Sequence, residues 1–443
     1  MSKQEQAGSG RRAGKGKRAA HSAAGVLGLL AVLGLTVSGS GGIQMSYNPS
    51  YINVALMGAT AGDDQDDTDA FRMAATGSNT IYVPAGEYVI TEPLVLNSAN
   101  LIGAGADKSV IIADFDDPSE PIIRAGRSST IRDIQIRFKD GLVTGGEGKG
   151  ERVAVFTAGR WSLQRGSTLS NVRIANVGTG LYSPGTTGDL EADSFSVTYD
   201  SIAIEDFSYR GVDFTSRVRT GNVFRNLYIS SGRFEADAAF YFGGEESETF
   251  LQSLTVADTR AKRPIHLGGA RALAADVIRL QNVQATKTGG LIVWEDSNGS
   301  IERLSVEDCQ AASGGSVVEI GGAEYSSADF QTLRYLRIGR LSLSGLNPDG
   351  AADFLLFRRE MTGEPFYVDV QDYAYEADGE AQRAAYEAFP VTDGQQLVFL
   401  AKGRLTASGP TEQRPAARLC PFYTTYEDTT LGRTVTWTGE GWQ

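Results

Sequence analysis

Residues 53–105 decide the fold of this chain. They contain the acidic run DDQDDT at residues 63–68 and the apolar segment IYVPAGEYVI at residues 81–90. The apolar segment predicts two strands, Ile81–Val83 and Tyr88–Ile90, because β-branched and aromatic residues favour strands and the Pro-Ala-Gly sequence turns the chain between them. We therefore expect a β-rich fold that begins here.

A short helix is predicted between the acidic run and the first strand. Asp66, Asp67 and Thr68 offer N-cap oxygens to an amphipathic segment, Ala70–Ala75, that ends at Gly77. Such a helix would cover the first coil of a strand stack and shield its open edge. We interpret the acidic run as part of this cap, because the glutamate that closes a calcium loop is absent.

One short phrase recurs along most of the chain: a polar residue followed by two aliphatic residues spaced by one. Versions begin at Asp133, Asn171, Ser201, Asn226, Ser253, Asn282, Arg303 and Arg340. Irregular intervals around a constant phrase are typical of a solenoid whose insertions are confined to loops. Period-2 alternation makes each phrase a strand with one buried face.

A second strand phrase falls between these repeats, as at residues 180–183, 211–214 and 290–293. Two strands and glycine-rich corners in each coil predict a parallel β-helix rather than a sandwich or a barrel. Several coils also carry an Asn or Asp four residues after the first aliphatic residue, namely Asn176, Asp206, Asp258 and Asp308. We interpret them as tight corners in left-handed geometry rather than as catalytic groups.

The opening stretch resembles the first coil of the pectate-lyase-like right-handed β-helix superfamily. The likeness lies in Asn53-Val54, the acidic run, YVPAGEY at residues 82–88 and LIGAG at residues 101–105; phage tailspikes and capsule depolymerases often begin in the same way. The resemblance implies an all-β fold, a single-stranded right-handed parallel β-helix with a short N-terminal capping helix and a small C-terminal β-rich module. This architecture hosts lyases, hydrolases and structural parts.

We expect three segments: a leader at residues 1–44, the β-helix at residues 45–357, and a capping or oligomerisation module at residues 358–443. The leader is basic up to Arg18, and its apolar run is too short for a membrane span and suits a signal peptide. The alternative is an attachment arm of the kind tailspikes carry. The localisation is accordingly extracellular or in a virion tail.

The C-terminal module is predicted to contain a helix around residues 380–387 and a closing strand at residues 434–437. It would cover the last coil, and it could also form the contact of a homotrimer.

The charge and cysteine content exclude several function classes. The net charge is −13, and residues 1–44 contribute +5, which leaves −18 for the rest. A body this acidic repels phosphate backbones, so we expect no nucleic-acid partner. Nor do we expect the folded body to bind a membrane. The only two cysteines, Cys309 and Cys420, are expected to be free thiols.

The second strand phrase predicts a column of outward-facing side chains, one from each coil. Its members are Tyr182, Asp213, Tyr241, His266, Ile292 (or Val293) and Glu319. Neighbours in such a column lie about 5 Å apart. Aromatic rings and carboxylates in a row suit a sugar chain, because rings cover apolar sugar faces and carboxylates accept hydroxyl hydrogen bonds. The alternative is a set of ordinary strand residues.

Nearby segments add further candidates. The second strand phrase at residues 239–244 is preceded by Arg233 and followed by Glu245 and Glu246. Trp294 lies at the far end of the column. We predict Asp213, Glu245, Glu246 and His266 as catalytic. Tyr182, Tyr241, Trp294, Glu319 and Arg233 are predicted to bind substrate. Glycosidases place two carboxyls about 5–5.5 Å or 6.5–9.5 Å apart, and Asp213 with either glutamate could meet one of these requirements.

Two function classes remain open at this point. The first is a polysaccharide-binding protein that depolymerises its ligand, with hydrolysis favoured over β-elimination. No metal or other cofactor is expected, and calcium is possible only for a lyase. The motifs RxPxxR of pectate lyases and NTD…GHG…RIK of polygalacturonases are absent. The second class is a non-catalytic structural or adhesive β-helix, such as a virion component.

Overall fold

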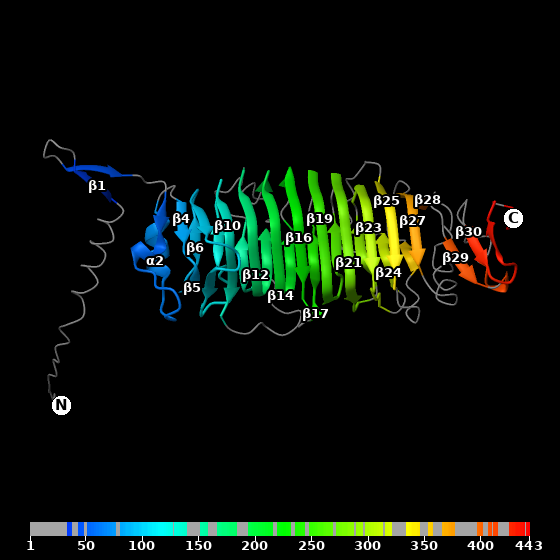
Figure 1. Ribbon diagram of the computed structural model, residues 1–443, viewed down its shortest axis with the longest axis horizontal. Coiled ribbons are helices and arrows are strands. Elements are labelled where there is room, and N and C mark those ends of the chain that lie inside the picture. Colours follow the sequence, from blue (N-terminus) through cyan, green and yellow to red (C-terminus); the bar gives the residue numbers. More distant parts are fainter. Residues whose placement is uncertain are drawn as a thin grey trace, which may run out of the picture.

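The computed structural model describes residues 33–37, 43–47, 51–76, 80–126, 128–139, 151–157, 166–183, 194–215, 219–231, 235–243, 248–268, 272–287, 289–295, 297–312, 315–320, 334–345, 353–357, 366–376, 397–401, 406–409, 411–414, 425–438 and 440–443. Parallel strands form an elongated stack along most of this length (Figure 1). The predicted right-handed parallel β-helix is therefore confirmed.

One ladder of parallel strands carries the first repeated phrase. Its members are β3 (Ile52–Asn53), β4 (Thr80–Val83), β7 (Asn100–Gly103), β10 (Thr130–Phe138), β12 (Thr168–Ser183), β14 (Thr198–Phe214), β16 (Asn222–Ser230), β19 (Glu248–Ala261), β21 (Ala272–Ala285), β23 (Gly299–Glu307), β25 (Arg334–Ser344), β27 (Phe366–Glu376) and β28 (Leu397–Ala401). Each phrase pairs in register with the next, as Val172 does with Ile202.

A second ladder carries the second phrase and holds the candidate site. It consists of β6 (Leu94–Leu96), β9 (Ile123–Ala125), β11 (Val153–Phe156), the ends of β12 and β14, β18 (Ala238–Phe242), β20 (Ile265–Gly268), β22 (Gly290–Glu295), β24 (Ser316–Ile320) and β26 (Asp353–Phe357). Shorter strands complete the coils, namely β5 (Gly86–Ile90), β8 (Ser109–Ala113), β17 (Glu235–Ala236) and the pair β13 (Ser194–Phe195) and β15 (Arg219–Thr220).

The predicted corners are confirmed. Asn176, Asp206, Asp258 and Asp308 have φ values of 52°, 50°, 45° and 51°. The polar residue that opens many first phrases is left-handed too, for example Asn171 at φ 50°, whose side-chain amide donates to Asp133 at 2.7 Å. Short polar side chains tolerate this conformation and can bond locally.

The interior is a continuous column of aliphatic and aromatic side chains. Near the site the rings of Tyr199 and Phe224 stack with centroids 4.6 Å apart, and Phe214 and Phe240 pack beside them. Gly180 allows a close approach here, because a Cβ atom at this position would lie 2.5 Å from the carbonyl oxygen of Gly211. Packing of this density fixes the strands that carry the site.

The N-terminal cap follows the prediction in outline. Helix α2 (Thr68–Ala74) lies at the blue end of the stack (Figure 1), preceded by the 3-10 helix η1 (Val54–Met57). The Asp66 carboxylate accepts from the backbone of Thr68 at 3.0 Å. Before the cap, β1 (Leu33–Val37) and β2 (Ile43–Tyr47) pair antiparallel.

The stack extends beyond the predicted end of the β-helix at residue 357. Strand β27 pairs parallel with β25, and β28 pairs with β27. The segment around Tyr373-Ala374-Tyr375 keeps period-2 alternation with aromatic residues in place of aliphatic ones, so the change in composition does not mark the end of the fold. The predicted helix around residues 380–387 lies outside the described residues.

A small sheet follows the stack. It contains β29 (Thr406–Gly409), β30 (Thr425–Asp428) and β31 (Arg433–Thr436), with β30 and β31 antiparallel, and the 3-10 helix η4 (Thr411–Gln413). The predicted closing strand is thus present as β31. Among the described residues, no helix has the length and apolar character that crossing a membrane requires.

Candidate functional site

The second ladder brings one residue from each of six strands into a single column. In register order they are Tyr182, Asp213, Tyr241, His266, Val293 and Glu319. The register resolves the position that the sequence left open, since Val293 pairs with His266 and Ile292 belongs to the core.

Most of this column is covered rather than exposed. Asp213 is 0% exposed, His266 1%, Glu319 3% and Tyr241 8%, whereas Tyr182 is half-buried. The sequence suggested an open strip of side chains along the flank. Charged side chains from neighbouring positions lie over the column instead, and Arg210 is the clearest case.

Arg210, near the end of β14, joins two carboxylates. Its Nη1 donates to Asp213 Oδ1 at 3.0 Å, and its Nε donates to Asp237 Oδ2 at 2.8 Å. Burial opposes the charge on Arg210, but Asp213 and Asp237 outweigh it and raise the pKa of Arg210 above its usual range. Asp213 is therefore one side of a buried ion pair.

Tyr241 is enclosed on both faces of its ring. The guanidinium carbon of Arg210, from the preceding strand, lies 3.5 Å from the ring centroid. The ring of His266, from the following strand, lies 4.6 Å away and is tilted by 40°. Because both faces are occupied, a sugar ring can reach only the edge and hydroxyl of Tyr241, not its face as predicted.

His266 has a buried acidic neighbour. Its Nε2 lies 3.0 Å from Oε2 of Glu295, and the two side chains are 1% and 2% exposed. Glu295 ends β22, where it pairs with Gly268, two residues beyond His266 in β20. A carboxylate this deeply buried is stable only with a charged or hydrogen-bonding partner.

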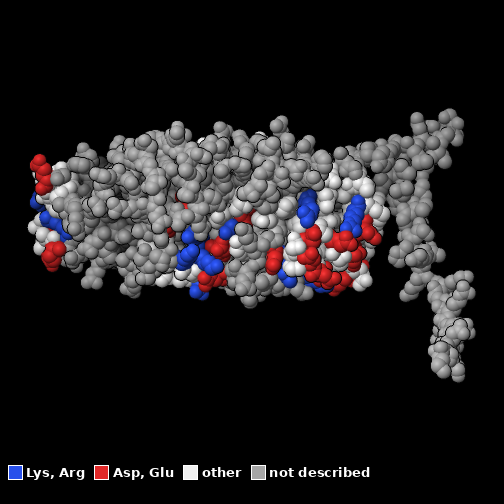
Figure 2. Space-filling model, turned by 180° about the vertical axis from the view of Figure 1, so that it is seen from behind, with Lys and Arg blue, Asp and Glu red and all other residues white. Residues whose placement is uncertain are grey.

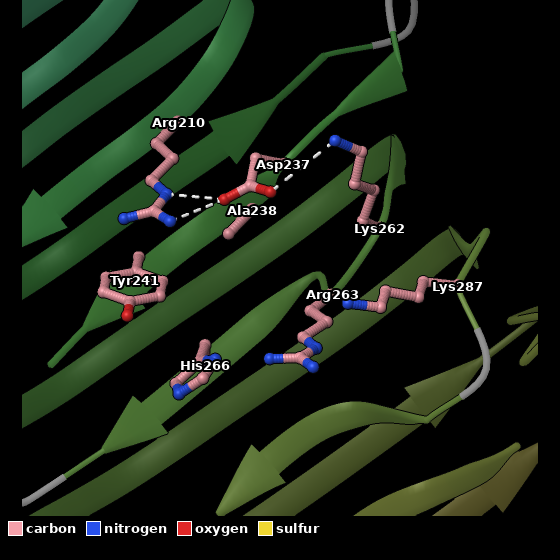
Figure 3. Close-up of a pocket in the computed structure, with 8 residues that line it drawn as sticks. All are labelled: Arg210, Asp237, Ala238, Tyr241, Lys262, Arg263, His266 and Lys287. Atoms are coloured by element: carbon pink, nitrogen blue, oxygen red, sulfur yellow. Dashed lines mark hydrogen bonds and ion pairs between the residues drawn. The ribbon is translucent and has the colours of Figure 1, made fainter. Parts of the chain in front are cut away.

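These groups border a pocket of about 100 Å³. Figure 3 shows Arg210, Asp237, Tyr241 and His266 around it, together with three further basic side chains, Lys262, Arg263 and Lys287. Lys262 Nζ lies 3.9 Å from Asp237 Oδ1. Viewed from behind, basic side chains lie among acidic ones midway along the stack, whereas acidic side chains predominate toward the end that carries α2 (Figure 2).

Two tyrosines near Arg210 keep their protons to high pH. Burial raises the pKa of Tyr209 to about 12, against the opposing effect of Arg210. Burial and then the Asp213 charge raise the pKa of Tyr182. Both side chains are therefore neutral hydrogen-bonding groups near pH 7.

The remaining residues that the sequence predicted for the site do not line this pocket among the described residues. Trp294 faces the core, 0% exposed, and its Nε1 donates to the Ser297 carbonyl at 2.7 Å, so it cannot contact a ligand on the flank. Glu319 accepts from the backbone of Gly290 at 2.9 Å, which links β24 to β22. Arg233, Glu245 and Glu246 lie outside the described residues.

Sequence reasoning missed part of the pocket. Arg210, Asp237, Glu295 and Lys287 were not predicted, although the basic pair Lys262-Arg263 stands out in an acidic chain. Arg210 follows a register irregularity between β12 and β14. At such a bulge, simple alternation does not predict where a side chain points.

Comparisons with known proteins agree with the fold. Residues 51–261 match the family model of rhamnogalacturonase A/epimerase, pectate lyase-like. The matched segment makes up just under half of the chain and lies within the right-handed parallel β-helix. The matched region includes Asp213 and Tyr241 and ends before His266. A search of curated proteins gave no significant match.

Several solved structures are similar to this chain at low identity. The catalytic unit of a thermostable GH87 alpha-1,3-glucanase from Streptomyces thermodiastaticus is 15% identical with a TM-score of 0.44, over 84% of this chain and 70% of that one. The tailspike of an Acinetobacter phage is 11% identical with a TM-score of 0.43, over 90% and 66%. The A-module of an Azotobacter vinelandii mannuronan C-5 epimerase is 15% identical with a TM-score of 0.34, over 72% and 100%.

Proposed function

We propose that this protein binds and processes an extracellular or cell-surface polysaccharide, and that the polymer docks at the pocket beside Tyr241 and His266. The match to the rhamnogalacturonase A/epimerase model supports a sugar polymer as the ligand, since the name of that family denotes polysaccharide-acting enzymes. The second ladder supplies a long flank of stacked strands, along which successive sugar units can lie.

The observation that carries the proposal is the charge of the pocket. Three cations, Lys262, Arg263 and Lys287, border it beside Arg210, whose charge is paired with Asp213 and Asp237, in a chain whose net charge is −13. Lysine and arginine bind carboxylate and sulfate groups by charge-assisted hydrogen bonds. The substrate is accordingly a polysaccharide with anionic sugar units, such as uronates.

The pocket also holds groups for proton transfer. His266 borders it, and imidazole exchanges protons near neutral pH. Beside a uronate, cations that neutralise the carboxylate favour removal of the adjacent C–H proton, which is the first step of β-elimination. Hydrolysis through Asp213 with Glu245 or Glu246 is the prediction from the sequence, and the Arg210 ion pair makes Asp213 a less available acid.

A polysaccharide panel tests the proposal. Neutral polymers, polygalacturonate, alginate and a sulfated polymer are incubated with wild type and with the double variant Lys262→Gln/Lys287→Gln. Binding, new reducing ends and the absorbance of unsaturated uronates are measured. We expect one or more acidic polymers to bind, and the double variant to bind at least tenfold more weakly.

The matched control is Lys108→Gln, since Lys108 is an exposed lysine away from the pocket. It should bind like wild type. Reducing ends without the absorbance indicate hydrolysis, and both together indicate β-elimination. Preferential binding of neutral polymers, unaffected by the double variant, would refute the docking site. Binding without product on any polymer would favour the adhesive alternative, a secreted or virion protein without catalytic activity. Light scattering would then measure whether that protein forms a trimer.

A further inference from the structure

Glu295 and His266 form the most enclosed ionisable pair beside the pocket. Neither side chain exceeds 2% exposure, and no polymer contact predicted from the sequence involves Glu295. We infer that Glu295 is a positioning residue for His266: its carboxylate keeps a proton on Nε2, so that the ring gains and loses its other proton at Nδ1. The consequence for catalysis rests on the proposed function, whereas the protonation pattern does not.

The strand register explains why the two side chains meet. His266 pairs with Val293, and Glu295 lies two residues further along β22, so both belong to the same face of the ladder. Leu267 and Trp294 alternate with them and fill the core. Because Leu267 and Trp294 anchor the two strands in the core, the strands keep Nε2 and Oε2 in their 3.0 Å contact.

Several other titratable and charged groups lie around the pocket that the imidazole borders. Tyr241 of β18 lies against one side of the ring, and Arg210, Lys262, Arg263, Lys287 and Asp237 line the same pocket. Glu295 is the carboxylate that lies 3.0 Å from Nε2. A buried carboxylate needs a donor, and an N–H at Nε2 can serve as that donor in both the neutral and the charged ring.

A purely structural contact and a positioning contact respond differently to substitution. In Glu295→Gln the side-chain oxygen still accepts a hydrogen bond and the volume is kept, so a structural contact would survive unchanged. Only the negative charge is lost. A shift in the titration of His266 therefore reports on the charge and not on packing.

Nitrogen-15 NMR of the histidine rings tests the inference without substrate. The chain has two histidines, His21 in the leader and His266, and His21→Gln assigns the signals. We expect Nε2 of His266 to be protonated across the titration in wild type. In Glu295→Gln its titration midpoint should fall by about 1 pH unit or more, as expected for the loss of a charge within hydrogen-bond distance, while His21 is unchanged.

The outcomes are separable from those of the polysaccharide panel. A wild-type ring protonated at Nδ1 and not at Nε2, or a midpoint that Glu295→Gln does not move, would overturn the inference; the first result needs no variant to fold. If the NMR pattern is as predicted but the protein binds no acidic polymer, the inference about Glu295 and His266 stands and the proposed function is refuted. If both hold, the acidic limb of the pH–rate profile moves with the NMR midpoint in Glu295→Gln.

Discussion

The guanidinium of Arg210 lies over the ring of Tyr241, with its carbon 3.5 Å from the ring centroid. Desolvated cation–π contacts of this kind contribute about 2 kcal/mol. The same guanidinium binds Asp213 and Asp237, so one side chain ties together strands β14 and β18 and the segment before β18. Arg210 therefore organises this part of the column rather than serving only as a charge for a ligand.

Replacing Asp213 should weaken the fold. In Asp213→Asn the buried Arg210 loses a charged partner, and removing one side of a buried ion pair typically costs about 3–5 kcal/mol. We expect a loss of about 3 kcal/mol in the free energy of unfolding, because Asp237 remains bound, measured by urea denaturation. The control is Asp237→Asn, whose side chain is 26% exposed and whose loss should be smaller. Unchanged stability together with lost polymer cleavage would return Asp213 to a catalytic role.

Salt should weaken binding of an acidic polymer. The Debye length falls from about 10 Å at 0.1 M to about 3 Å at 1 M ionic strength, so attraction between the cationic pocket and the polymer is screened. We expect the affinity for polygalacturonate or the acidic polymer identified in the panel to fall tenfold or more between 0.1 and 1 M NaCl, on the basis of that screening. A neutral polymer of similar length is the control. An affinity that does not respond to salt would argue for recognition by hydrogen bonds and packing alone.

Cys309 should be inert at neutral pH and should make stability sensitive to alkali. The side chain is 1% exposed, and burial raises the pKa of its thiol to about 11. Because the folded pKa exceeds the unfolded one, the stabilisation is complete below about pH 9 and is lost as pH rises through 11. In the native protein, a thiol reagent should not modify Cys309 at pH 8, which peptide mass spectrometry can check.

The matching stability test compares Cys309→Ala with wild type. The variant should lose less unfolding free energy than wild type between pH 9 and pH 11, by up to about 3 kcal/mol for a difference of two pKa units. Identical slopes for the two proteins would show that the thiol does not titrate differently in the folded state.

The left-handed corners predict opposite outcomes for two substitutions at one position. Asp206 has a φ of 50°, a conformation that costs a β-branched residue more than about 1–2 kcal/mol and glycine nothing. Asp206→Gly should therefore leave the melting temperature nearly unchanged, and Asp206→Val should lower it. Ala203→Val, at a half-buried strand position in the same coil, is the control for added bulk, since strands accept valine. Equal melting temperatures for the two Asp206 variants would contradict the corner assignment.

The fold was predictable because its signals are local and repeated. Period-2 phrases such as Asn171-Val172-Arg173-Ile174 identify a strand, its buried face and its corner without reference to distant residues. The column was predictable for the same reason, since a constant phrase places Tyr182, Asp213 and Tyr241 at equivalent positions.

The contacts of the column could not be predicted in this way. Arg210 reaches Asp237 of the next coil, and Glu295 reaches back to His266, so each contact depends on side-chain direction near a strand end. Trp294 was misplaced because the phrase at residues 290–293 could be aligned in two frames. A shift of one residue exchanges the core and flank faces of a strand.

The left-handed corners also confine the effects of insertions. A polar residue at φ near 50° recurs at equivalent positions in many coils and fixes the corner there, so a longer loop in one coil does not shift the register of the coils beside it. The loops that flank the pocket can therefore change in length and composition while Arg210, Tyr241 and His266 keep their alignment. Under the proposed function, the sugars recognised by a lineage of such proteins diverge by exchange of loops over an unchanged stack of strands.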